Sequence, residues 1–142
     1  MAYNILVVDD SRTMRMVIIK TLKACGFQVG QFFEASNGNE AMEILGKDWV
    51  DLVIADHNMP DMDGLALLSE MKKDEILQAI PVVMITTEGS QERIKEFMEK
   101  GAADYIKKPF SPETIRDKLR LIKGVTQAGD GRDENGDDGF DF

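Results

Sequence analysis

Uninterrupted apolar runs recur along the chain at 5–8 (ILVV), 52–55 (LVIA) and 82–85 (VVMI). Apolar tetrads of this kind are typical of strands in a parallel sheet that is covered on both faces. Two weaker apolar pairs, at 32–33 and 105–106, predict two further strands. The hydrophobic pattern therefore predicts five short strands.

Between these runs, apolar residues recur at the spacing of an amphipathic helix. The five apolar stripes cover 14–25, 41–45, 65–71, 94–98 and 115–122. Asn37 with Glu40, Ser90, and Ser111 with Pro112 mark helix starts, and Gly101 and Gly124 mark helix ends. Strict alternation of strands and helices predicts an α/β fold, a doubly wound five-stranded parallel sheet with five helices.

In such a sheet, ligands bind beyond the carboxyl ends of the strands. The polar residues that end or follow the predicted strands are Asp9 and Asp10, Asp56, Thr86 and Lys108. Any one of them alone is an ordinary loop residue or helix cap. Because the strands are parallel, we expect all five side chains to meet at one edge of the sheet.

Three carboxylates at one edge repel each other by about 4 kcal/mol per pair at about 4 Å and an effective dielectric near 20. A hard divalent cation relieves this repulsion, and oxygen ligands with room for water and a phosphoryl group favour Mg²⁺ over Ca²⁺. Lys108 adds a second positive charge, Thr86 a hydroxyl and Asp56 a carboxylate nucleophile. This set of groups suits phosphoryl transfer.

Composition narrows the function classes. A chain of 142 residues with 43% hydrophobic and 30% charged residues is expected to form one globular domain, which excludes a multidomain enzyme. The formal net charge of −9 disfavours DNA binding. One cysteine, Cys25, and one histidine, His57, cannot form a disulfide or a four-ligand Cys/His zinc site. No apolar run suits a signal peptide or a membrane span, so we expect a cytoplasmic protein.

The segment 124–142 differs from the rest of the chain. It has six acids against one arginine, five glycines and no apolar period, so we predict that 1–123 is the globular domain and that 124–142 is a disordered acidic tail. The tail is either freely solvated or folded onto the basic segment 107–123. His57 and Cys25 are interpreted as structural residues, with His57 either in the core or on the surface.

Four motifs together carry a resemblance to a known family: the Asp9-Asp10 pair, the segment DHNMPDMDG at 56–64, Thr86, and YIKKPF at 105–110. From 5 to about 123, the chain resembles response-regulator receiver domains. It is most similar to the stand-alone chemotaxis regulators of the CheY type. The resemblance implies the flavodoxin-like strand order 2-1-3-4-5.

The resemblance also implies residue roles. Asp56 is then the phosphate acceptor. Asp10, Asp56 and the backbone carbonyl of Asn58 bind Mg²⁺, and Asp9 contributes through water. Thr86 and Lys108 would bind the phosphoryl oxygens.

The switch and the lifetime of the phosphoryl group are implied in the same way. Tyr105 would turn inward with Thr86, and the Lys108-Pro109 bond would be cis. Asn58 and Glu88 would tune dephosphorylation.

The implied partners are a histidine kinase, a phosphatase and a target that binds the surface of the fourth helix, fifth strand and fifth helix. That target is a flagellar switch protein if the chain controls a motor. The alternative is a phosphorelay carrier that exchanges phosphate with a histidine phosphotransfer protein. In either case the chain turns over no separate substrate and is not an enzyme in that sense.

Two other classes use related features. A haloacid dehalogenase-type phosphatase also needs Mg²⁺ and a nucleophilic aspartate, but it requires an acid two residues after that aspartate, where this chain has Asn58. A pseudo-receiver that only binds partners is expected to lack the acceptor, the acids or the lysine, and all of them are present here. The signalling switch therefore explains the motifs best.

Overall fold

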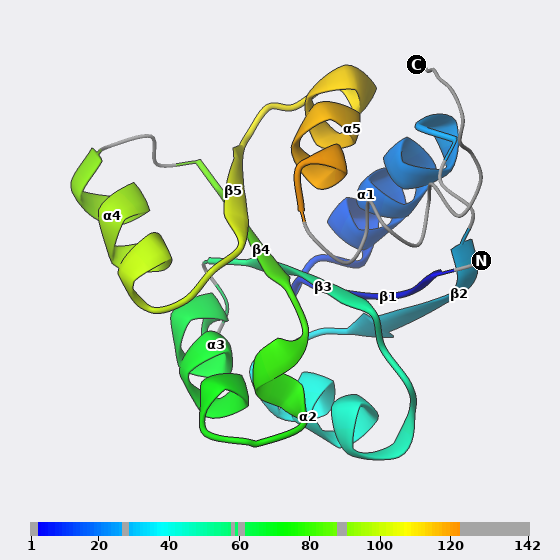
Figure 1. Cartoon of the computed structure of the whole chain (residues 1–142). Helices are drawn as coiled ribbons and strands as arrows, with labels where there is room; N and C mark the ends of the chain where they lie inside the picture. Colours follow the sequence, from blue (N-terminus) through cyan, green and yellow to red (C-terminus); the bar gives the residue numbers. More distant parts are fainter. Residues whose placement is uncertain (1–2, 27–28, 58, 60–61, 88–90, 123–142) are drawn as a thin grey trace, which may run out of the picture.

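A computed structural model describes residues 3–26, 29–57, 59, 62–87 and 91–122. In this part of the chain, five parallel strands form one sheet in the order β2-β1-β3-β4-β5 (Figure 1). The strands are β1 (Tyr3–Val8), β2 (Val29–Ala35), β3 (Leu52–Asp56), β4 (Val82–Thr86) and β5 (Asp104–Lys107). All five predicted strands and their predicted order are confirmed.

Five α-helices alternate with the strands, as the apolar stripes predicted. They are α1 (Arg12–Ala24), α2 (Gly38–Lys47), α3 (Gly64–Lys72), α4 (Gln91–Glu99) and α5 (Pro112–Arg120). A short 3₁₀ helix, η1 (Leu77–Ala79), precedes β4 and was not predicted. None of the helices in the described ranges is long and apolar enough to cross a membrane.

Side-chain caps set the starts of several helices. The Asn37 side chain accepts a hydrogen bond from the backbone N–H of Glu40 at 2.9 Å, and the Glu40 carboxylate accepts from Ser36. Ser111 caps α5 by accepting from Thr114, which leaves Pro112 at the first helical position. These two predicted starts are confirmed, whereas the predicted cap Ser90 and end Gly124 lie outside the described residues.

The α4 end is also as predicted, because Gly101 follows it with a φ of +104°. A glycine reaches this left-handed conformation without steric cost, which allows the chain to turn toward β5.

Alternate residues of the strands face two cores, one on each side of the sheet. On one side, β1 residues Ile5 and Val7 pack with α1 and α5; on the other, Leu6 and Val8 pack with α2, α3 and α4. This double burial is the reason that the strands read as continuous apolar runs in the sequence.

Two residues of the predicted apolar stripes are exposed. Val17 of α1 is 43% exposed and Met98 of α4 is 45% exposed. Each lies at the edge of its stripe, beside the buried Ile18 or Phe97, where the helix has already turned away from the sheet. The predicted domain boundary at 123 and the acidic tail fall outside the described residues, so they stay predictions.

Candidate functional site

The structure brings the predicted residues together at the carboxyl edge of the sheet. Asp9 and Asp10 follow β1, and Asp56 ends β3. One carboxylate oxygen of each lies within 4.8 Å of the other two. The Lys108 ammonium lies 3.3 Å from Asp56 Oδ1 and 3.9 Å from Asp9 Oδ2. Three acids and one cation are therefore gathered at the ends of β1, β3 and β5.

Thr86 belongs to the same edge. It is buried at the end of β4, where it pairs in register with Lys107 of β5. Its backbone carbonyl accepts a hydrogen bond from the Lys108 N–H at 2.8 Å. This bond holds the start of the β5–α5 connection against β4, and the Lys108-Pro109 peptide bond that follows is cis, as predicted.

Asp9 is the most buried of the three acids, with 1% exposure. Burial is the main cause that raises its pKa from 3.8 to about 6. The Ser11 N–H, which donates to Asp9 Oδ1 at 2.9 Å, lowers the pKa, whereas the nearby charge of Asp56 raises it and that of Lys108 lowers it. Oδ2 has no hydrogen-bond partner within the described ranges and lies 3.9 Å from Lys108 Nζ.

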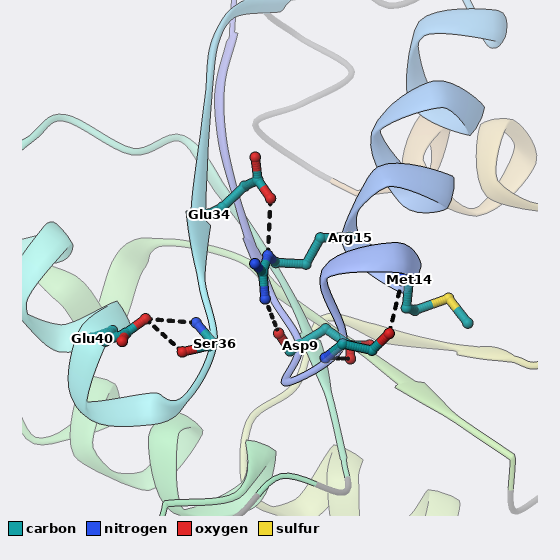
Figure 2. Close-up of polar contacts among 7 residues, drawn as sticks. Asp9, Met14, Arg15, Glu34, Ser36 and Glu40 are labelled. Atoms are coloured by element: carbon teal, nitrogen blue, oxygen red, sulfur yellow. Dashed lines mark hydrogen bonds and ion pairs between the residues drawn. The ribbon is translucent and has the colours of Figure 1, made fainter.

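Arg15 holds the backbone on which Asp9 sits (Figure 2). Its Nη1 donates to the Asp9 carbonyl oxygen at 2.7 Å, and its Nε donates to the Glu34 carboxylate at 2.9 Å. The guanidinium thus links the end of β1 to β2 and the first turn of α1. Sequence reasoning missed this contact, since Arg15 looks like an ordinary exposed residue of an amphipathic helix.

Asp56 is positioned by close packing behind it. The first residue of α3, Gly64, lies so near that a Cβ there would be 2.5 Å from the Asp56 carbonyl oxygen and 2.5 Å from Met84 Cε. The next residue, His57, is 6% exposed and packs edge-on against Phe97 with ring centroids 5.2 Å apart. His57 is therefore a core residue, and the surface alternative is wrong.

Tyr105 lies on β5, half-buried, with a contact that the sequence did not predict. Lys118 Nζ of α5 is 3.9 Å from the centroid of the Tyr105 ring and 3.4 Å from Asp104 Oδ1. A cation over the face of a ring is attracted by the ring quadrupole. No local pattern marks this contact, because Lys118 reaches the ring only after the chain has turned back along the sheet.

The acidic cluster could hold a metal ion. Its donors are carboxylate oxygens only, which suits a hard cation, and the buried Oδ2 of Asp9 accepts no hydrogen bond from the described residues. The predicted ligand Asn58 and the predicted lifetime residue Glu88 lie outside the described residues. The cluster within the described ranges is therefore Asp9, Asp10 and Asp56.

The structure is thus an α/β domain whose doubly wound parallel sheet carries an acidic cluster and a lysine at its carboxyl edge, where ligands bind in such folds. Residues 5–120 match the family model of the response regulator receiver domain, and the chain belongs to that family. It is thus a receiver domain of two-component signalling.

Curated relatives include chemotaxis proteins. The chain is 40% identical over 123 residues to chemotaxis protein CheY1 of Helicobacter pylori, a match that covers 86% of this chain and 98% of the relative. It is 43% identical over 119 residues to chemotaxis protein CheY-3 of Vibrio cholerae, covering 84% and 90%. Among solved structures, chemotaxis protein CheY4 of Vibrio cholerae superposes with a TM-score of 0.77 at 32% identity, covering 86% and 99%. The predicted family and strand order are confirmed.

Proposed function

We propose that the chain is a phosphorylation-controlled switch in which Asp56 accepts a phosphoryl group from a histidine kinase. The observation that carries this proposal is the Lys108 ammonium 3.3 Å from Asp56 Oδ1, with Asp9 and Asp10 in the same cluster. The nearby cation and the two further acids support the proposal, because an acceptor carboxylate needs positive charge for the phosphoryl oxygens and neighbouring oxygen ligands for a metal ion.

In the proposed transfer, an oxygen of the Asp56 carboxylate attacks the phosphorus of a phosphohistidine. The new P–O bond forms as the P–N bond breaks, and the departing imidazole nitrogen takes up a proton. The Lys108 ammonium and the Thr86 hydroxyl bind the phosphoryl oxygens, on which negative charge gathers.

Mg²⁺ is the proposed cofactor, held by Asp10 and Asp56 directly, by the Asn58 carbonyl, and by Asp9 through water. When bound, it neutralises the charge of the phosphoryl oxygens. The raised pKa of Asp9 supports this assignment, because it shows that the buried carboxylate is poorly compensated by protein groups alone.

The signal is proposed to leave through the surface of α4, β5 and α5. The acyl phosphate draws Thr86 inward, and the space it leaves admits the Tyr105 ring, which biases a two-state equilibrium. In the present structure the Tyr105 ring packs against the core cluster on the α2, α3 and α4 side of the sheet, with Lys118 Nζ of α5 3.9 Å from the ring centroid. The exposed side of this surface would bind the target.

We assign the switch to chemotaxis, with a flagellar switch protein as target, on the likeness to chemotaxis proteins. A phosphatase would reset it, and Asn58 and Glu88 would set the lifetime of the phosphoryl group. The chain would act in the cytoplasm and turn over no separate substrate. A relay carrier that exchanges phosphate with a histidine phosphotransfer protein is the alternative.

The acceptor assignment is tested with Asp56→Asn. We expect the wild-type chain to gain one phosphoryl group per molecule from acetyl phosphate and Mg²⁺, measured by intact-protein mass spectrometry, and Asp56→Asn to gain none. Asp48→Asn, an exposed aspartate beyond α2, is the matched control and should behave as wild type. Undiminished phosphorylation of Asp56→Asn would show that the acceptor is another residue.

The target is tested by binding. A flagellar switch peptide and a histidine phosphotransfer domain are titrated with the chain, with and without beryllofluoride and Mg²⁺ as a mimic of the acyl phosphate. Tighter binding of the switch peptide on activation supports motor control. No switch binding together with rapid phosphoryl exchange with the phosphotransfer domain would replace it with the relay.

A further inference from the structure

Positive charge is concentrated on two of the described helices. α1 carries four cations and no acid, and α5 carries three cations and two acids. By the same count, α2 and α4 each have one more acid than base, and α3 is balanced. A chain whose net charge is −9 thus has a cationic surface along α1 and α5, which we name the α1–α5 face.

The two helices form one continuous face. Ile18 and Leu22 of α1 share a core cluster with Ile115 and Leu119 of α5. At one end of the contact, Cys25 Sγ donates to the Pro112 carbonyl oxygen at 3.0 Å. Of the α1 cations, Arg12, Lys20 and Lys23 are exposed, whereas Arg15 is engaged with Asp9 and Glu34.

An apolar groove of about 320 Å³ opens next to this face, beside the start of α1. Its walls come from the first two turns of α1, the residue after β4 and the β5–α5 connection: Met14, Val17, Thr87, Lys108, Pro109 and Phe110. The groove explains the exposure of Val17. It also borders the candidate site, because Lys108 is both a wall of the groove and the cation next to Asp56.

The segment 124–142 has the composition that fits this face. It has six acids and one arginine, so its net charge is −5, opposite in sign to the +5 of α1 and α5. Two of the helix cations, Arg15 and Lys118, are paired with Glu34 and Asp104, and the others of α1 remain exposed. The segment also has two large aromatic residues, Phe140 and Phe142. A phenylalanine ring buries a large apolar area and fits a groove of this volume.

The length of the segment is also suitable. The described chain ends at Ile122, which packs in the same core cluster as α1 and α5. The segment 123–140 has 18 residues, and a random coil of that length has a root-mean-square span of about 23 Å. The 13-residue helix α1 is about 20 Å long, so Phe140 can reach any point of the α1–α5 face.

We propose that the segment 124–142 docks on the α1–α5 face, with its acids along the cations of α1 and with Phe140 or Phe142 in the groove beside Lys108. Tethering to α5 gives the segment a high effective concentration at the groove, so weak contacts are sufficient. The docking does not rest on the proposed function.

The docking is tested in the full-length chain by paramagnetic relaxation enhancement. A nitroxide is attached at Gly139→Cys in a Cys25→Ser background, where serine keeps a donor for the Pro112 carbonyl. We expect the amide signals of Met14, Val17 and Phe110 to broaden selectively. Phe140→Ala with Phe142→Ala should abolish the broadening, and about 0.5 M salt, where the Debye length is about 4 Å, should weaken it.

Charge variants provide a matched pair. Lys20→Glu removes an exposed cation from α1 and should weaken the broadening, whereas Lys47→Glu, at the end of α2 on the other side of the sheet, should leave it unchanged. Uniform broadening, or broadening centred on α2 or α3, would overturn the proposal. A mixture of two chains tests contact between copies: one is isotope-labelled and has no nitroxide, and the other carries the nitroxide. Broadening of the isotope-labelled chain in this mixture would assign the contact to a second copy and would also overturn the proposal. None of these measurements requires phosphorylation, so a failure of the docking proposal can be distinguished from a failure of the proposed function.

Discussion

Asp9 is buried among acids at a cost that a single substitution can measure. In the metal-free protein its pKa is raised from 3.8 to about 6, mainly by burial. At 1.36 kcal/mol per pKa unit, the ionised carboxylate destabilises the fold by about 3 kcal/mol near pH 7. Asp9→Asn removes the charge and keeps an oxygen to accept from the Ser11 N–H. We therefore expect the variant to be more stable than wild type, by up to that amount.

The pH dependence gives the prediction a second part. Between about pH 4 and pH 6, the folded chain holds a proton on Asp9 that the unfolded chain releases, so the stability of the wild type falls as the pH rises through this window. Above pH 6 the wild type has lost this stability completely, and below pH 4 it has lost none of it. The advantage of Asp9→Asn should thus be large near pH 7 and vanish near pH 4.

The assay is urea unfolding followed by far-UV circular dichroism, with EDTA, near pH 7 and near pH 4. Asp48→Asn controls for the removal of one negative charge from an exposed site. An Asp9→Asn variant that is no more stable than wild type near pH 7, or equally favoured at both pH values, would refute the reasoning. Added Mg²⁺ should stabilise the wild type more than the variant.

Two further substitutions test the surroundings of the site. Gly64→Ala places a Cβ 2.5 Å from the Asp56 carbonyl oxygen and should lower the free energy of unfolding in urea by about 1–3 kcal/mol. Gly46→Ala, whose Cβ would have no atom within 4 Å, should raise it by about 0.5–1 kcal/mol. Equal tolerance of both substitutions would contradict the close packing behind Asp56. Lys118→Met removes the cation from the Tyr105 ring, so it should lower the free energy of unfolding by about 0.5–1 kcal/mol and shift the ring proton resonances of Tyr105. Unshifted resonances would show that the ring does not depend on the Lys118 cation.

Much of the fold could be predicted from hydrophobic pattern. The tetrads at 5–8, 52–55 and 82–85 stand out because both faces of the central strands are buried, and Asn37 and Ser111 mark helix starts by hydrogen bonds to residues three positions away. The edge strands are less distinct, since β2 has exposed residues among its seven. The 3₁₀ helix η1 is too short to leave a periodic signal.

The candidate site was predictable to the extent that topology determines it. Parallel strands bring their carboxyl ends to one edge, which is why Asp9, Asp56 and Lys108 meet. The contacts of Arg15 and Lys118 were not predictable, because each joins consecutive elements through a long side chain whose direction depends on packing. The groove beside Val17 was missed for the same reason.

The register between neighbouring strands has a consequence for how the protein folds. Asp56 is paired with Ile85, and Thr86 with Lys107, in a ladder where successive side chains point to opposite faces of the sheet. If β3 slipped by one residue relative to β4, every side chain of β3 would turn to the opposite face of the sheet. Asp56 would then no longer lie in the acidic cluster. A chain that folds with the register shifted by one residue would still bury apolar residues but could not be phosphorylated. The phosphorylatable fraction of a refolded sample would therefore count correctly aligned molecules, which spectroscopic measures of helix and strand content do not distinguish.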